Sequence, residues 1–175
     1  MLVVGISACL LGESVRYDGG DKQNHALTAH KDKQIKYIAI CPEAGCGLGV
    51  PREAMQLEGD PNTPRLLTIN SRVDKTDLLT NWSKEQIANL QNDKIDGFIF
   101  KNRSPSCGLN KVLVHKTNPT TPQQYGAGLF AQQIKNHFDD LPMAQDDDMQ
   151  NQHNIQKFID EMKAYKAVTT SKNHG

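Results

Sequence analysis

The chain has 175 residues, and its 20 Lys and Arg residues balance its 20 Asp and Glu residues. This length fits one domain with a sizeable core that needs no disulfide or metal staples. The neutral net charge excludes an overall positive field that would draw the protein to nucleic acid or to an anionic membrane surface. The apolar runs fall well short of the roughly 18 to 20 residues that span a bilayer, so we expect no membrane segment.

The first nine residues, MLVVGISAC, form a short apolar run that could be mistaken for a signal peptide. The run lacks a positive start, and only eight residues precede Cys9, whereas a signal peptide has about 15 to 30. We therefore interpret it as a buried first strand and expect a cytoplasmic protein. Disulfides are disfavoured in that compartment, where the four cysteines indicate metal binding or chemistry more often than cross-links.

Short apolar, β-branched runs alternate along the chain with helical or loop-like segments. The runs predicted as strands cover residues 2–6, 36–40, 95–100 and 111–115. Helical spacing of apolar residues predicts helices over residues 74–91 and 126–138. The nearly continuous apolarity of the first two strands is typical of a parallel sheet buried on both faces. This alternation predicts an α/β fold: a single Rossmann-like domain over residues 1–142, with a mainly parallel sheet flanked by helices.

The remaining residues, 143–175, have a different character. A polar, acidic stretch that contains the run from Asp146 to Asp148 is predicted to be a linker with a solvated patch. Apolar residues then recur at helical spacing between Ile155 and Tyr165, which predicts a C-terminal amphipathic helix. We expect residues 167–175 to be a disordered tail.

Three cysteines follow three of the predicted strands. Cys9 comes three residues after the first strand, Cys41 immediately after the second, and Cys107 seven residues after the third, in the loop KNRSPSCG. The carboxyl ends of parallel strands share one edge of an open α/β sheet, which is where such sheets form their sites. The three thiols could therefore converge on one point.

Converging thiolates suit a soft metal centre, but the pattern leaves its identity open. Zinc takes four protein ligands in a structural site, or three and a water in a catalytic site. An iron–sulfur cluster normally takes four thiolates, so that three would leave one iron open. The cysteines could also be small buried hydrophobic residues. Glycine and proline in all three loops favour a metal centre, because they let the backbone approach a bulky inorganic group closely.

Four motifs occur in order along the chain: GISACLLGESVRYDGG, CPEAGCGLGVPRE, DGFIFKNRSPSCGL and GAGLFA. Together they resemble the uncharacterised-domain family that includes the thiouracil desulfidases (TudS-like proteins), over roughly residues 1–140. GLGVPRE and the segment after residue 140 are nearer to the longer, two-domain branch of that family. The resemblance implies that a second helical domain is absent here or reduced to one helix.

The resemblance also implies a cofactor and a set of site residues. Cys9, Cys41 and Cys107 match the three ligands of a [4Fe–4S] cluster whose fourth iron has no protein ligand, and which can be lost in air. Glu43 and Ser104 match the positions that carry the acid–base chemistry. The implied function is an enzyme that desulfurises a small thiolated nucleobase or thioamide without net redox change, converting C=S to C=O.

Some assignments remain open at this stage. Ser106 could take the role of Ser104, because it is adjacent to a ligand position. Cys46 is interpreted as a spare thiol, and Arg52 and Lys101 as cations that offset cluster charge. Arg16 could contact substrate or brace its own loop through Asp18. The alternative function is a non-enzymatic zinc or cluster module that acts with a protein partner, and the sequence does not predict an oligomeric state.

Overall fold

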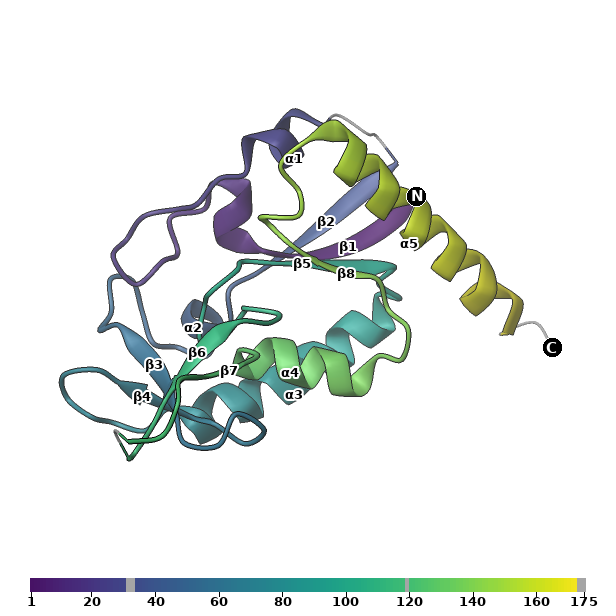
Figure 1. Cartoon of the computed structure of the whole chain (residues 1–175). Helices are drawn as coiled ribbons and strands as arrows, with labels where there is room; N and C mark the ends of the chain where they lie inside the picture. The colour runs from purple at the N-terminus through teal and green to yellow at the C-terminus, as the bar shows by residue number, and fades with distance from the viewer. Residues whose placement is uncertain (31–33, 119, 173–175) are drawn as a thin grey trace.

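The first predicted strand lies at the centre of a parallel sheet in the computed structural model, which describes residues 1–30, 34–118 and 120–172 (Figure 1). Strand β1 (Leu2–Ser7) pairs on one side with β2 (Ile35–Ile40) and on the other with β5 (Gly97–Phe100). Strand β8 (Met143–Gln145) pairs in parallel with β5, which gives the order β2-β1-β5-β8. The predicted α/β fold with a parallel sheet is confirmed.

The two central strands, β1 and β5, contribute fully buried side chains to the core. Val4 and Ile6 of β1 and Phe98 and Phe100 of β5 have no exposed surface. The two phenylalanine rings stack with their centroids 4.2 Å apart. Gly5 makes this packing possible, because a Cβ at that position would lie 2.3 Å from a ring carbon of Phe98. Apolar burial on both faces of these strands explains why their sequence reads as a continuous hydrophobic run.

Helices cover both faces of this sheet (Figure 1). On one face lie α3 (Thr76–Asn92) and α4 (Leu129–His137), whose buried residues join the same core cluster as Phe98 and Phe100. On the other face, α1 (His25–Ala29) and α5 (Gln152–Lys172) pack against β1. The positions of α3 and α4 confirm the two helices predicted from apolar spacing. Among the described helices, none is long and apolar enough to cross a membrane.

A second, smaller sheet lies beside α3 and α4, with the order β4-β3-β6-β7. Its strands are β3 (Met55–Glu58), β4 (Arg65–Thr68), β6 (Val112–His115) and β7 (Gln124–Gly126). β3 and β6 are parallel, whereas the two outer strands pair antiparallel. The strand predicted over residues 111–115 therefore exists, but it belongs to this sheet. The other three strands were not predicted, because they span three or four residues and carry polar side chains.

The prediction for the C-terminal segment was wrong in two respects. Residues 143–145 are not a linker, since they form β8 and extend the parallel sheet. Residues 167–172 are not disordered, since α5 continues to Lys172, while residues 173–175 lie outside the described residues. The helix persists because its apolar side pairs with the sheet, through Ile155, Phe158, Ile159 and Met162, and because Lys166 binds the buried carboxylate of Asp96 at 2.8 Å.

Candidate active site

The three cysteines that follow strands lie at the carboxyl edge of the parallel sheet. Cys9 is in the 3-10 turn η1 (Ala8–Leu11) directly after β1, and Cys41 comes directly after β2, where it precedes the short helix α2 (Pro42–Gly45). Cys107 is in the loop after β5. All three line one cavity of about 490 Å³. Residues nearly one hundred positions apart are thus brought together, because parallel strands end at a common edge.

Cys46 occupies a different place. It caps α2 at its carboxyl end, its Sγ lies 3.4 Å from the carbonyl oxygen of Glu43, and it packs against the core cluster of α3 and α4. The side chains that line the cavity include the other three cysteines and not Cys46. Of the two thiols in CPEAGC, Cys41 therefore lines the cavity, whereas Cys46 packs against the core.

The cavity thiols are electrostatically unfavourable as free thiolates. Burial raises the pKa of Cys9 to about 11, against a partial lowering by the Arg16 guanidinium. Burial also raises the pKa values of Cys41 and Cys107. The charge of Glu43 raises the pKa of Cys41 further, and the charges of Cys41, Cys9 and Glu43 raise the pKa of Cys107 further. Thiolates at these positions need a cation to hold them, so metal binding here would release protons.

The donor set at this cavity consists of three thiols. No three His, Cys, Asp or Glu side chains among the described residues are arranged to hold one metal ion. A zinc site would need such an arrangement. In an iron–sulfur cluster each thiolate binds a different iron, so its ligands can stand further apart around a shared space. Three thiols from three loops around one cavity have that arrangement.

Glu43 lies two residues after Cys41 and is 9 % exposed on the cavity wall. Both of its carboxylate oxygens are engaged: Arg52 Nε donates to Oε2 at 2.8 Å, and Ser106 Oγ donates to Oε1 at 2.6 Å. The first turn of α2 brings the carboxylate to this point. A carboxylate oriented from both sides is suited to a general acid–base role at a fixed position.

Arg52 is held by the protein through all three guanidinium nitrogens. Besides its bond to Glu43, it donates from Nη1 to the carbonyl oxygen of Gly49 at 2.9 Å and from Nη2 to that of Val15 at 3.0 Å. Its side chain is 6 % exposed. The sequence suggested a cation for cluster charge, whereas the structure pairs this cation directly with Glu43.

Ser104 and Ser106 occupy different positions in the loop that carries Cys107. Ser104 Oγ accepts hydrogen bonds from the backbone N–H of Cys107 at 3.0 Å and of Ser106 at 3.3 Å, and so shapes the turn. Its Oγ lies 3.2 Å from Ser106 Oγ. Because the Ser106 hydroxyl donates to Glu43, the Ser104 hydroxyl is the donor in this pair. Ser106 is thus the direct partner of Glu43, and Ser104 reaches it through Ser106.

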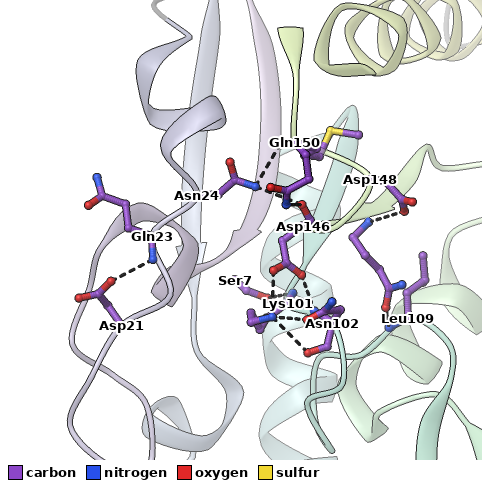
Figure 2. Close-up of polar contacts among 12 residues, drawn as sticks. Ser7, Asp21, Gln23, Asn24, Lys101, Asn102, Leu109, Asp146, Asp148 and Gln150 are labelled. Atoms are coloured by element: carbon purple, nitrogen blue, oxygen red, sulfur yellow. Dashed lines mark hydrogen bonds and ion pairs between the residues drawn. The ribbon is translucent and has the colours of Figure 1, made fainter. Parts of the chain in front are cut away.

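A network of polar contacts joins the ends of β1, β5 and β8 (Figure 2). Lys101 Nζ binds Asp146 Oδ2 at 2.8 Å, and Asp146 Oδ1 accepts from the N–H of Asn102 at 2.7 Å. Asn24 Nδ2 donates to the Asp146 carbonyl oxygen at 3.1 Å, and Ser7 Oγ accepts from the Lys101 N–H at 2.9 Å. Asp146 is therefore part of the sheet edge rather than of a solvated patch, because β8 places it beside Lys101.

Sequence reasoning missed Ser7 and Asp146. The sequence shows only that Ser7 ends a strand and that Lys101 follows one. It does not show that Lys101 contacts Ser7, which is 94 residues away, or Asp146, which is 45 residues away. The structure brings the site residues predicted from the sequence together in this cavity. It is lined by the predicted ligands and acid–base residues, Cys9, Cys41, Cys107, Glu43 and Ser104, and by the cations Arg16, Arg52 and Lys101.

The chain thus combines an α/β fold that has a parallel sheet with a cavity at the carboxyl edge of that sheet, lined by three cysteines. Comparison with known sequences and structures identifies the family of proteins to which it belongs. The family described as 2-thiouracil desulfurase matches residues 4–146. The chain therefore belongs to the 2-thiouracil desulfurase family, and the predictions of the family and of an enzyme are confirmed.

A solved structure agrees with this family. The [4Fe-4S]-dependent thiouracil desulfidase TudS is 26 % identical in sequence and superposes with a TM-score of 0.66. The match covers 84 % of this chain and 92 % of that protein. A search of the curated proteins found no match.

Proposed function

We propose that the protein removes sulfur from a thiolated pyrimidine of the 2-thiouracil type. The reaction consumes water and releases hydrogen sulfide: 2-thiouracil and water give uracil and H₂S, with no electron transferred to or from the protein. The proposal is supported by membership of the 2-thiouracil desulfurase family and by the likeness to TudS. We place the reaction in the cytoplasm, where the free cysteines would remain reduced.

The observation that carries the proposal is the convergence of three thiols and one carboxylate on a single cavity. We assign Cys9, Cys41 and Cys107 as ligands of a [4Fe–4S] cluster. When bound, such a cluster supplies an iron without a protein ligand that attracts the substrate sulfur as a Lewis acid. We leave Cys46 out of this ligand set, because its Sγ contacts the Glu43 carbonyl oxygen and Cys46 does not line the cavity.

Glu43 is the proposed general base. A water that attacks the thiocarbonyl carbon must lose a proton as its oxygen bonds to that carbon, and Glu43 is the carboxylate on the cavity wall that is oriented to take it. Arg52 fixes Oε2, and the Ser106 hydroxyl fixes Oε1. As the C–S bond breaks, the departing sulfur receives the proton held by Glu43 and the proton of the new hydroxyl group on the same carbon. The sulfur then leaves as H₂S, the carbonyl group of uracil forms, and Glu43 returns to its carboxylate form.

The hydroxyl chain from Ser104 to Ser106 to Glu43 gives this proton a path. Both hydroxyls line the cavity, and their hydrogen bonds can reverse direction together when Glu43 carries a proton. Ser104 then stands at one end of the path and Glu43 at the other, and both residues line the cavity. This arrangement gives Ser104 an acid–base role that depends on Ser106.

Sulfide release tests the proposal. Protein purified without oxygen and reconstituted with iron and sulfide should convert 2-thiouracil to uracil, with one sulfide released for each uracil formed, as measured by liquid chromatography and a sulfide assay. Cys107→Ser should lose the iron–sulfur absorbance and the activity, whereas Cys46→Ala should keep both. A reconstituted protein with full iron content that forms no uracil would overturn the proposed function.

A further inference from the structure

The loop of residues 15–20 (VRYDGG) forms one wall of the cavity. The loop is closed by two backbone hydrogen bonds, from the Arg16 N–H to the Gly20 carbonyl at 3.1 Å and from the Gly19 N–H to the Arg16 carbonyl at 2.9 Å. Arg52 holds it from the other side, through its N–H to the Tyr17 carbonyl at 2.8 Å. Arg16 thus extends from a backbone that is fixed relative to Glu43.

The cations in the cavity wall differ in how their donors are used. Arg52 donates from all three nitrogens to protein acceptors, and the Lys101 ammonium binds Asp146 and Asn102. Among the residues that the structure describes, Arg16 has no comparable partner: its Nε is buried without a hydrogen bond, and the oxygen of Asp18 that pairs with it lies 3.9 Å away. That distance is too long for a hydrogen bond.

A buried donor without an acceptor is unfavourable, and native proteins rarely keep one without a reason. Arg16 is half-buried, with 24 % of its side chain exposed, and its guanidinium lies over the Tyr17 ring at 5.7 Å from the centroid. Its charge also acts on Cys9 across the cavity. A ligand acceptor that enters the cavity would therefore meet a positive charge, on a side chain that is partly exposed and whose Nε has no acceptor in the protein.

We propose that Arg16 binds the ring carbonyl oxygen of the thiolated pyrimidine and thereby orients the thiocarbonyl group toward the three thiols and Glu43. This inference rests on the proposed function. A pyrimidine of the 2-thiouracil type carries sulfur on one carbon and a carbonyl oxygen on another, so a donor at one wall can fix which of the two faces the thiols. The planar fork of Arg suits an acceptor on a ring edge. Arg16 is then a residue that determines specificity, through direct contact with substrate.

The test pairs two ligands that differ in this carbonyl and in the N–H group beside it. Uracil carries both groups and pyrimidin-2-one carries neither. Since neither ligand has sulfur to release, binding can be measured by calorimetry on the cluster-loaded protein. We expect the wild type to bind uracil roughly 10- to 100-fold more tightly, the range for a hydrogen bond to a charged group. Arg16→Gln should bring this ratio of affinities close to one. The ratio for Arg16→Lys should lie between those of Arg16→Gln and the wild type. The same ordering should hold for kcat/KM with 2-thiouracil against pyrimidine-2-thione.

Two variants serve as controls. Asp18→Asn keeps an acceptor oxygen for the Gly20 N–H, a contact of 3.0 Å, but removes the charge beside Arg16. Arg65→Gln removes an arginine from an exposed pair with Asp74, away from the cavity. Both should retain the wild-type ratio. If Asp18→Asn lowers the ratio as much as Arg16→Gln does, Arg16 is only a brace for its loop.

The other possible results of these measurements also decide whether Arg16 binds the substrate carbonyl. A wild type that does not discriminate between the two ligands, or that binds neither, overturns the role of Arg16. Loss of iron from Arg16→Gln that matches its loss of binding would assign Arg16 to the cofactor instead. A wild type that discriminates between uracil and pyrimidin-2-one but releases no sulfide from 2-thiouracil would contradict the proposed reaction and leave the carbonyl contact standing.

Discussion

Glu43 and Arg52 form an ion pair of 2.8 Å in the wall of the cavity, with side chains only 12 % and 6 % exposed. The two residues lie on opposite sides of the glycine-rich turn CGLGV, and Arg52 also binds the turn at the Gly49 carbonyl oxygen. The pair thus fixes the carboxylate relative to Cys41 at the start of α2. A nearly buried pair of this kind is costly to break on one side only, because the remaining charge is left without a partner.

Arg52→Met should lower the free energy of unfolding by about 3 kcal/mol, the lower end for the removal of one partner from a buried pair. Urea denaturation of the cluster-free protein measures this. Arg72→Met is the matched control, because Arg72 pairs with Glu58 at a half-exposed position, where such a pair contributes about 1 kcal/mol or less. Equal losses for the two variants would contradict the structural role of the Glu43–Arg52 pair.

Glu43→Gln should leave iron content near the wild-type value and reduce kcat by about 10²- to 10⁴-fold, the usual contribution of a general acid or base. Gln keeps the size of the side chain and can still accept from Ser106, but it removes both the basicity of the carboxylate and its charge pair with Arg52. Single-turnover formation of uracil measures the effect. Glu58→Gln is the surface control, and a Glu43→Gln protein with wild-type turnover would remove Glu43 from the mechanism.

Ser106→Ala should reduce kcat by about 10-fold or more through loss of the 2.6 Å bond to Glu43. If the two hydroxyls form one path, Ser104→Ala should also lower kcat, and the double variant should be no slower than the worse single variant. The cycle of kcat values for the four proteins measures this coupling. Effects that multiply would show that Ser104 acts independently, through the turn that it stabilises at Cys107.

Much of this site follows from the sequence, and the part that does not has a clear cause. The runs that became β1, β2 and β5 are apolar over several residues, so their ends, and the cysteines just after them, could be placed on one edge. The pairings that orient the site lack such a signal. Ser106 lies 63 residues from Glu43, and Asp146 meets Lys101 only because β8, three residues long, joins the sheet. Short strands and long-range polar contacts leave no periodic pattern.

Alkylation should separate Cys46 from the cavity thiols. Burial raises the pKa of Cys46 above its usual value, so the reactive thiolate is scarce at neutral pH and becomes more abundant as the pH rises. The rate of iodoacetamide labelling at Cys46 should therefore increase with pH between about 7 and 9. In the cluster-loaded protein Cys46 should be the cysteine that is labelled, as read by peptide mass spectrometry.

Removal of the cluster with a chelator should change this pattern. Cys41, which is half-buried, should then become reactive, while Cys9 and Cys107 should remain slow because both are buried. Protection of Cys46 by the cluster, with release of its reactivity on chelation, would indicate that Cys46 is a fourth ligand and that no iron remains open for substrate.

We propose that three cysteines from three strand ends hold one cluster and leave one iron free. A crystal structure of the anaerobically reconstituted protein, with anomalous diffraction data collected at the iron edge, tests it most directly. We expect one four-iron cluster bound by Cys9, Cys41 and Cys107, with the fourth iron facing Glu43 and without a protein ligand. A single metal ion, a cluster that includes Cys46, or iron bound away from this cavity would contradict the account.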